Sequence, residues 1–201
     1  MGAIAWNEMT WNEMTWINPP PRAEPDGDDL IVSTGRNTDF WRSTAYGFVH
    51  DDGHLLGAPF PAEAAIEVSF RAEFEAQFDQ AGLMLRAGPE TWLKTGVELS
   101  DGELFASVVV TNERSDWSVS PVPDSVTGQK LTFRASRKGD AITVRYRVGE
   151  EPRMHLLRVA YLPPEAQLVA GPMCCSPTRE GLSVRFEPVR VGPPDAPLHE
   201  G

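Results

Sequence analysis

Apolar and polar residues alternate with a period of two along most of the chain. The alternation is clearest over residues 65–74, 131–137, 142–148 and 182–186. Because successive side chains of a β-strand point to opposite faces, this pattern predicts strands that are buried on one face. Glycine, proline and aspartate interrupt the runs at short intervals, as turns between antiparallel strands require. No stretch carries an apolar stripe of helical period over three turns. About a dozen short strands without crossover helices predict an all-β fold, either an antiparallel sandwich or a wide barrel.

One predicted strand, residues 92–99, places costly side chains on the face that should meet solvent. Its apolar face holds three aliphatic residues, Leu93, Val97 and Leu99. Its opposite face holds an aromatic ring, a cation, a glycine and a carboxylate: Trp92, Lys94, Gly96 and Glu98. The glycine leaves room for a ligand to approach the backbone. We interpret this face as a ligand-facing row, whereas an ordinary surface ion pair beside a boundary tryptophan is the structural alternative.

The neighbouring predicted strands extend this row. A hairpin around residues 88–90 pairs residues 79–86 with 92–99 and brings Gln80 and Arg86 onto the same face. In residues 103–111, one face carries Phe105, Ser107, Val109 and Thr111, and the other carries Leu104, Ala106, Val108 and Val110. The pattern does not decide which of these two faces is the core.

Tryptophan beside acidic and amide groups on an exposed sheet face is typical of sugar-binding sites. An aromatic ring packs against the apolar face of a sugar, while charged groups hydrogen-bond its hydroxyls. Asp39 near Trp41, and Asp116 next to Trp117, add two further pairs of an acid and a tryptophan to the predicted surface. Each tryptophan taken singly can instead fill an edge of the core. The predicted ligand-binding residues are Asp39, Trp41, Gln80, Arg86, Trp92, Lys94, Glu98, Thr111, Asp116 and Trp117.

Charge and composition exclude several classes of partner. The chain has 18 Lys and Arg against 29 Asp and Glu, a net charge of −11. This charge repels phosphate backbones and anionic membrane surfaces, so we expect neither nucleic acid nor membrane as a partner. The first residues lack the charged and apolar regions of a secretory signal, so we expect a cytoplasmic protein. The adjacent Cys174 and Cys175 are expected to be free thiols buried in a strand.

Both ends of the chain differ in character from its middle. The pentapeptide Trp-Asn-Glu-Met-Thr occurs twice in tandem, at 6–10 and 11–15, which indicates a local duplication ahead of the first true strand. The last ten residues are rich in proline and glycine and contain little to bury. We therefore predict an N-terminal extension over residues 1–13, a β-sandwich domain over 14–191 and a flexible tail over 192–201.

Several motifs, taken in order, resemble the regulation-of-enolase family. They are Thr38-Asp39-Phe40-Trp41 with Tyr46-Gly47, Asp79-Gln80-Ala81-Gly82-Leu83-Met84, Trp92-Leu93-Lys94 with Gly96 and Glu98, residues 107–111, and Ser115-Asp116-Trp117-Ser118. The resemblance runs over residues 15–190. It implies a two-sheet antiparallel jelly roll similar to the concanavalin A-like lectins and glucanases, with carbohydrate bound on the concave face. It implies no activity, because the family offers no catalytic residues to carry over.

Three functions remain open from the sequence. The first is binding of a small carbohydrate or sugar-like metabolite on the concave face, with a regulatory role. The second is an enzyme acting on such a compound, either a glycoside hydrolase or an isomerase or lyase, with Lys94, Glu98 and Asp79 as candidate acid–base residues. Glu98 would raise the pKa of Lys94, which counts against a lysine base, and the Glu-x-Asp-x-Glu motif of retaining glucanases is missing. The third is a module that docks a protein through exposed tryptophans. We expect no metal ion or other cofactor.

Overall fold

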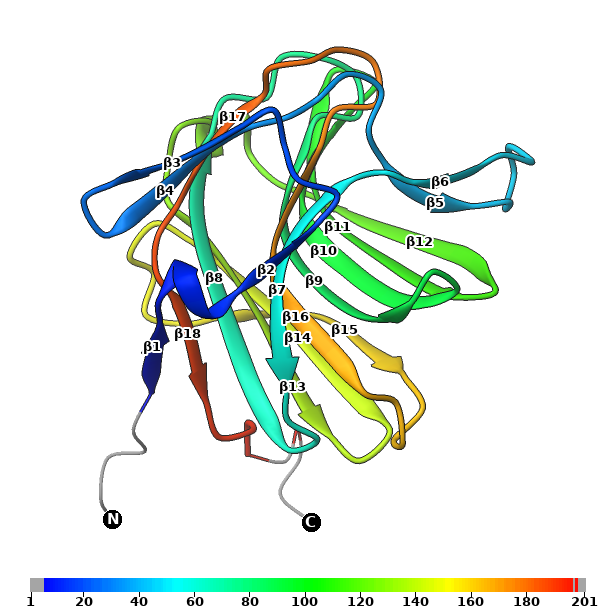
Figure 1. Cartoon of the computed structure of the whole chain (residues 1–201), viewed down its shortest axis with the longest axis vertical. Helices are drawn as coiled ribbons and strands as arrows, with labels where there is room; N and C mark the ends of the chain where they lie inside the picture. The colour runs from blue at the N-terminus through cyan, green and yellow to red at the C-terminus, as the bar shows by residue number, and fades with distance from the viewer. Residues whose placement is uncertain (1–5, 197, 199–201) are drawn as a thin grey trace.

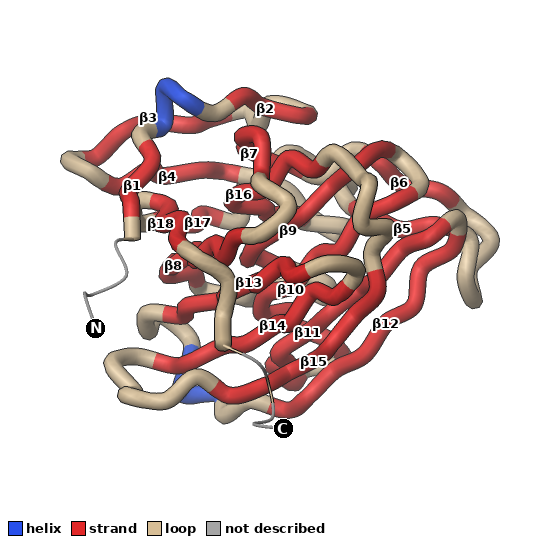
Figure 2. The backbone as a smooth tube through the Cα atoms, turned by 90° about the horizontal axis from the view of Figure 1, so that it is seen from below, coloured by secondary structure: helices blue, strands red, loops and turns tan. Residues whose placement is uncertain are grey.

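Two antiparallel sheets pack face to face in the computed structural model, which describes residues 6–196 and 198. Figures 1 and 2 show the two layers and a short hairpin that stands beside them. The fold is therefore the predicted two-sheet antiparallel jelly-roll sandwich and not a barrel. Within the described residues, no helix is long and apolar enough to cross a membrane.

The strands are assigned to three sheets. The nine-stranded sheet contains, in spatial order, β15 (His155–Tyr161), β14 (Ala141–Val148), β13 (Leu131–Lys138), β8 (Ala64–Ala72), β17 (Ser183–Phe186), β4 (Asp29–Ser33) and β3 (Arg22–Asp26), and also β18 (Val189–Gly192), which pairs with β8 and with β1 (Asn7–Met9). The seven-stranded sheet contains β12 (Arg114–Pro121), β11 (Glu103–Asn112), β10 (Thr91–Ser100), β9 (Gln80–Gly88), β16 (Leu168–Cys175), β7 (His54–Phe60) and β2 (Thr15–Ile17). The third is a hairpin of β5 (Phe40–Arg42) and β6 (Val49–Asp51), and two single-turn helices are η1 (Trp11–Glu13) and η2 (Asp124–Val126).

The main core lies between the two large sheets. On β10, Leu93 and Val97 are fully buried in it, as the alternation predicts. On β11, Ala106 and Val108 belong to the same cluster. The structure thus shows which face of β11 meets the main core, a choice that the sequence left open. Ser107 and Val109 point away from that core.

The outer face of the seven-stranded sheet is also partly covered. The β5–β6 hairpin packs over it and contacts β12 (Figure 1). Under the hairpin lies a second apolar cluster that contains Phe40, Trp41, Leu55, Met84, Trp92, Val109, Met173 and Cys175. The two cysteines are free and buried as predicted, with Cys174 in the main core and Cys175 in this second cluster.

The segment predicted as an N-terminal extension is joined to the sandwich from residue 6 onwards. The Trp6 ring lies 4.7 Å from the Arg134 guanidinium and 5.4 Å from that of Arg190. β1 pairs with β18, and the Trp11 indole N–H donates to the carbonyl of Asp28 at 2.9 Å. The predicted boundary at residue 14 is wrong for residues 6–13, because these tryptophans find partners on the folded domain. Residues 1–5 lie outside the described part.

The segment predicted as a flexible tail is anchored as far as Asp195. Its carboxylate accepts hydrogen bonds from Arg134 at 2.9 Å and from Arg145 at 3.2 Å. Its backbone N–H donates to the Ser136 hydroxyl at 2.8 Å. The prediction of a flexible tail is wrong for residues 192–195, because a single acid near the end of the chain meets two arginines on the nine-stranded sheet. Residues 197 and 199–201 lie outside the described part.

Candidate functional site

Pairing between β9, β10 and β11 arranges the outer side chains in rows across the sheet. Glu98 on β10 lies opposite Gln80 on β9, and Lys94 lies between Met84 on β9 and Val109 on β11. A further row contains Arg86, Trp92 and Thr111. The predicted hairpin between residues 79–86 and 92–99 is therefore confirmed. It places the predicted polar residues of both strands on one face.

The β5–β6 hairpin covers the row that contains Trp92. The Trp92 ring is fully buried, with its centroid 6.1 Å from that of Phe40. Arg86 donates to both carboxylate oxygens of Asp51 at 2.6 and 2.8 Å. The prediction that Trp92 and Arg86 contact a ligand is wrong, because Phe40 and Asp51 occupy the space above them.

Thr111, at the end of the same row, also holds the hairpin. Its hydroxyl is fully buried and bonds the Ser115 hydroxyl at 2.8 Å. The Ser115 oxygen in turn accepts the backbone N–H of Arg42 on β5 at 2.9 Å. Thr111 therefore anchors β5 and does not reach a ligand, which corrects its predicted role.

The uncovered part of this face forms a pocket of about 330 Å³ between the hairpin and β12. Its floor comes from β9, β10 and β11 and consists of Gln80, Lys94, Glu98 and Val109. The hairpin contributes Trp41, Tyr46, Phe48 and His50, and β12 contributes Trp117. The remaining lining residues come from loops: Asn37, Asp39, Phe78, Pro177 and Thr178.

Six of the predicted ligand-binding residues thus line one pocket: Asp39, Trp41, Gln80, Lys94, Glu98 and Trp117. Asp116 does not, because it precedes Trp117 on a strand and points to the opposite face. Its carboxylate is 69% exposed and pairs with Arg158 of β15 at 3.3 Å. The alternation of apolar and polar residues indicated no role for Phe48 and His50, and Tyr46 stood out only as part of a family motif. Three aromatic residues within five positions, 46–50, were the available signal.

Lys94 is a buried ammonium paired with Asp39. The distance from Nζ to the Asp39 carboxylate is 2.8 Å. Burial lowers the pKa of Lys94, but the charges of Asp39 and Glu98 and the hydrogen bond to Asp39 outweigh it, so the net pKa is raised. Lys94 is therefore protonated at neutral pH. It cannot act as the proton-abstracting base of an isomerase or lyase.

Glu98 is a nearly buried carboxyl group on the same floor. Burial raises its pKa, and the charge of Asp39 acts in the same direction. The Lys94 ammonium, the Ser107 hydroxyl and the Trp117 indole oppose this shift without cancelling it. The indole N–H of Trp117 also donates to the Ser107 hydroxyl at 3.0 Å. Glu98 therefore holds its proton at a higher pH than an exposed glutamate does, and when protonated it is both a donor and an acceptor.

The Glu98→Gln variant should depend less on pH for its stability. Because the pKa of Glu98 is raised on folding, the folded state binds more protons than the unfolded state between the two pKa values, and the wild type loses stability as the pH rises through that window. Glutamine does not titrate, so the stability of the variant relative to the wild type should increase as the pH rises above about 4.3, the ordinary pKa of a glutamate. Urea unfolding at several pH values measures this difference. Parallel pH profiles would contradict the raised pKa.

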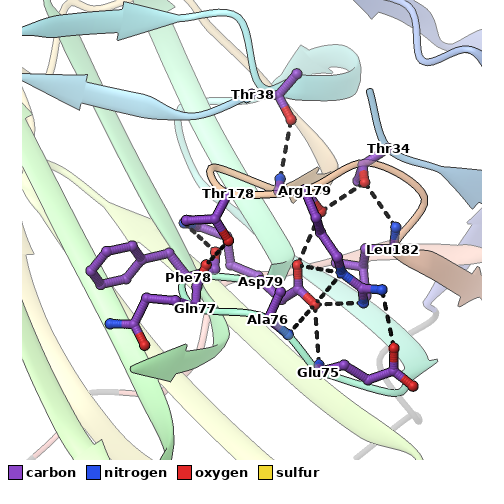
Figure 3. Close-up of polar contacts among 12 residues, drawn as sticks. Thr34, Thr38, Glu75, Ala76, Gln77, Phe78, Asp79, Thr178, Arg179 and Leu182 are labelled. Atoms are coloured by element: carbon purple, nitrogen blue, oxygen red, sulfur yellow. Dashed lines mark hydrogen bonds and ion pairs between the residues drawn. The ribbon is translucent and has the colours of Figure 1, made fainter. Parts of the chain in front are cut away.

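Asp79, a predicted catalytic candidate, is fully buried and all its acceptor capacity is used (Figure 3). Arg179 donates to it through Nε at 2.9 Å and Nη2 at 2.6 Å. The backbone N–H groups of Glu75 and Ala76 each donate at 3.1 Å, and so does the Ser176 hydroxyl. Asp79 does not line the pocket. Its predicted catalytic role is therefore wrong, because these donors make it a structural anchor.

The Asp79 network positions the rim of the pocket. Phe78 has a left-handed backbone with φ of 65°, and its ring points away from the Asp79 carboxylate (Figure 3). The Thr178 hydroxyl donates to the carbonyl of Gln77 at 2.9 Å and joins the two segments that the network connects. Phe78 and Thr178 both line the pocket.

Acidic, histidine and cysteine side chains do not gather into a metal site in the described part of the chain, where no group of three or more is placed to hold an ion. The pocket itself offers hydrogen-bonding groups, one buried ion pair and aromatic surface.

Comparison with known proteins gives matches over nearly the whole chain. The sequence model of the family described as "Protein of unknown function (DUF1349)" matches residues 16–194. Regulation of enolase protein 1 of Saccharomyces cerevisiae is 36% identical over 171 residues, which are 85% of this chain and 84% of that protein. The resemblance to the regulation-of-enolase family is confirmed.

Solved structures share the fold. The crystal structure of a functionally unknown protein from Saccharomyces cerevisiae superposes with a TM-score of 0.87 at 31% identity and covers 94% of this chain and 100% of that one. Xylan β-1,4-xylosidase from Bacillus halodurans C-125 gives a TM-score of 0.64 at 10% identity and covers 82% of this chain but 32% of the enzyme chain. At that identity the likeness shows the fold alone, and it concerns about a third of the enzyme's length.

Proposed function

We propose that this chain, which belongs to the DUF1349 family, binds a small neutral carbohydrate or a similar polyhydroxylated metabolite in the pocket between the β5–β6 hairpin and β12. The observation that supports this proposal is the meeting of buried polar groups and exposed aromatic rings in one pocket of about 330 Å³. That volume is at the lower end of the range of about 300–1,000 Å³ for small-molecule sites. A sugar needs both kinds of group, because its hydroxyls require hydrogen bonds and its ring faces are apolar.

The floor supplies donors and acceptors for hydroxyl groups. The Gln80 amide oxygen offers an acceptor, because the amide nitrogen already donates to the Asp39 carboxylate at 3.4 Å and to the Phe78 carbonyl at 3.2 Å. The Lys94 ammonium has donors beyond the one used by Asp39. Glu98 adds a carboxyl group whose raised pKa favours the form that both donates and accepts. Since these groups are buried before a ligand arrives, an analogue that lacks the matching hydroxyls leaves them unsatisfied and is rejected.

The charge of the pocket favours neutral ligands over phosphorylated ones. Lys94 is the only lysine or arginine among the described lining residues, and Asp39 neutralises it at 2.8 Å. Glu98 adds either no charge or a negative one. A phosphate group would need a free cation or a set of backbone N–H donors. It would also enter against the −11 net charge of the chain.

Binding without turnover fits the pocket better than catalysis. Glycoside hydrolysis needs two carboxyl groups in separate roles. Asp39 and Glu98 are the carboxyl groups that line the pocket within the described residues, and Asp39 is committed to Lys94. The protonated Lys94 does not supply the base of an isomerase or lyase. The name of the yeast relative, Regulation of enolase protein 1, supports a regulatory use of binding in this chain as well.

Docking of a protein through the exposed aromatic residues is less well supported. A docking surface of that kind is a broad apolar patch. Tyr46, Phe48 and Trp117 are instead exposed around a concavity with a polar floor.

A thermal-shift comparison tests the proposal. The wild type and the Trp117→Ala variant are screened against four neutral sugars: xylose, xylobiose, glucose and cellobiose. Glucose 6-phosphate is added as the charged counterpart of glucose. At least one neutral sugar should raise the melting temperature of the wild type by mass action, whereas the phosphate should not. Loss of the Trp117 ring should weaken binding about tenfold or more. Xylo-oligosaccharides are included because of the fold likeness to a xylosidase.

Tyr161→Ala is the matched control, because Tyr161 is an exposed aromatic residue on β15 and does not line the pocket. Its response to the sugars should equal that of the wild type. A shift that survives in Trp117→Ala, or a preference for the phosphate, would overturn the proposed site or its selectivity.

A further inference from the structure

We infer that the pocket takes the end of an oligosaccharide chain, with the terminal sugar unit on the polar floor and the next unit stacked on the Tyr46–Phe48 pair at the mouth. This inference rests on the proposed function and goes beyond it by naming the ligand as a chain end. It follows from how exposure, ring geometry and hairpin anchoring vary between the floor and the mouth of the pocket.

Exposure rises from a polar floor to an aromatic mouth. Lys94 is 4% and Glu98 7% exposed, whereas Tyr46 is 57% and Phe48 44% exposed. A free monosaccharide needs only the floor and the adjacent rings. Tyr46 and Phe48 then keep much of their apolar surface in water. A second sugar unit attached to the first would cover them.

The floor is closed, so a chain can enter from one side. β9 and β10 are continuously paired beneath the pocket, with Gly82 opposite Gly96 and Gln80 opposite Glu98. Below them lies the main core, which contains Leu83 and Val97. A polysaccharide cannot pass through this sheet. A sugar chain must therefore enter and leave on the side of the aromatic rings, away from the main core.

Tyr46 and Phe48 form an aromatic platform whose rings are stacked on one another, with the His50 ring edge-on against Phe48 at 5.1 Å. The Tyr46 and Phe48 rings stack at 5.5 Å with an angle of 10° between their planes, and Trp41 packs against Tyr46 at 5.6 Å. The tip of the hairpin is closed by its own hydrogen bonds: Ser43 N–H donates to the Phe48 carbonyl at 2.8 Å, and the Trp41 indole donates to the Thr44 carbonyl at 3.0 Å. A ring that is already ordered stacks on a sugar at a small entropic cost.

Contacts made by both strands of the hairpin fix this platform relative to the floor. Arg42 pairs with Glu90 at 2.6 Å and donates through Nε to the Glu113 carbonyl at 3.1 Å. On the other strand of the hairpin, Asp51 receives both hydrogen bonds of Arg86. The platform is therefore tied to β9 and to the turns that flank β10 and β11. Floor and mouth are held at a set separation, as two subsites for linked sugar units require.

Calorimetric titration with sugars of increasing length tests the inference. Two series of sugars are titrated into the full chain of the protein. One is xylose, xylobiose and xylotriose, and the other is glucose, cellobiose and cellotriose. In the wild type the disaccharide of the preferred series should bind about tenfold tighter than the monosaccharide, and the trisaccharide should add less than threefold. Tyr46→Ala should lose the gain from the second unit, so that the monosaccharide and the disaccharide bind this variant with similar affinity. Tyr161→Ala, which removes a tyrosine that is also 57% exposed, should behave as the wild type does.

The outcomes separate the two proposals. Equal affinity for monosaccharide and disaccharide in the wild type would overturn the chain-end inference and leave the proposed function standing. A second-unit gain that persists in Tyr46→Ala would overturn the role of the platform. Failure of every sugar to bind the folded wild type would overturn the proposed function itself.

Discussion

Replacement of Trp92 by alanine should lower the free energy of unfolding by about 3–5 kcal/mol, the usual cost of truncating a large aromatic residue in a core. The Trp92 ring is fully buried between β10 and the β5–β6 hairpin and packs against Phe40. Its removal leaves a cavity at the point where the hairpin rests on the sheet. For a chain of this size, the melting temperature should fall by about 10 °C.

Trp117→Ala is the control for this prediction, because it removes the same side chain from the other side of the site. Trp117 is 38% exposed whereas Trp92 is fully buried, so the Trp117→Ala variant should lose clearly less stability than Trp92→Ala. It should nevertheless lose sugar binding, as argued above. Thermal unfolding and titration of both variants separate core from binding surface. A stable Trp92→Ala protein that no longer binds sugar would show that Trp92 faces the ligand after all.

Asp79→Ala should destabilise the chain by about 3–5 kcal/mol, because it removes one partner of a buried charge pair. Arg179, two backbone N–H groups and the Ser176 hydroxyl all lose their acceptor. The effect is expected to exceed that of an ordinary surface ion pair because Asp79 is fully buried. Any sugar affinity that remains should also fall, since the network positions Phe78 and Thr178 at the pocket rim.

Glu75→Ala provides the matched control. Glu75 pairs with the same Arg179 at 3.1 Å, but its side chain is 66% exposed. Its loss should cost less than about 1 kcal/mol. Urea unfolding measures both variants under one condition. Similar losses for Asp79→Ala and Glu75→Ala would contradict the view that the buried carboxylate anchors the two segments.

The period-two pattern was sufficient to predict the strands and most of the floor. It placed Lys94 and Glu98 on one face and Leu93 and Val97 on the other, and the short turn after Gly88 fixed the pairing with β9. These features depend on residues that are close in sequence. The hairpin turn and the alternation therefore determine them without knowledge of the rest of the fold.

The hairpin that covers half of this face could not be read from the pattern. β5 and β6 are three residues each, too short for alternation to be visible. Their position depends on long-range partners: Arg86 meets Asp51 and Trp92 meets Phe40. Two non-glycine residues at the tip, Ser43 and Ala45, adopt left-handed backbones with φ of 59° and 62°, which no composition rule indicates.

Asp79 shows the same limitation for charged residues. Its partner Arg179 is 100 positions away in the sequence, so the sequence alone suggested a free acid beside the ligand-facing row. The same applies to Trp6 and Asp195, whose partners Arg134, Arg145 and Arg190 lie on strands remote in sequence. Composition identified the ends of the chain as loop-like but could not show that individual side chains anchor them.

The indole N–H signals of the six tryptophans provide the most direct test of the proposed pocket. In a two-dimensional NMR titration with the sugar that gives the largest thermal shift, the signals of Trp41 and Trp117 should move, because both rings line the pocket. Those of Trp6, Trp11 and Trp16, which lie outside it, should stay in place, and that of the buried Trp92 should move less than those of Trp41 and Trp117. Movement confined to the N-terminal tryptophans, or unchanged signals for Trp41 and Trp117 at saturating sugar, would contradict the assignment of this pocket as the binding site.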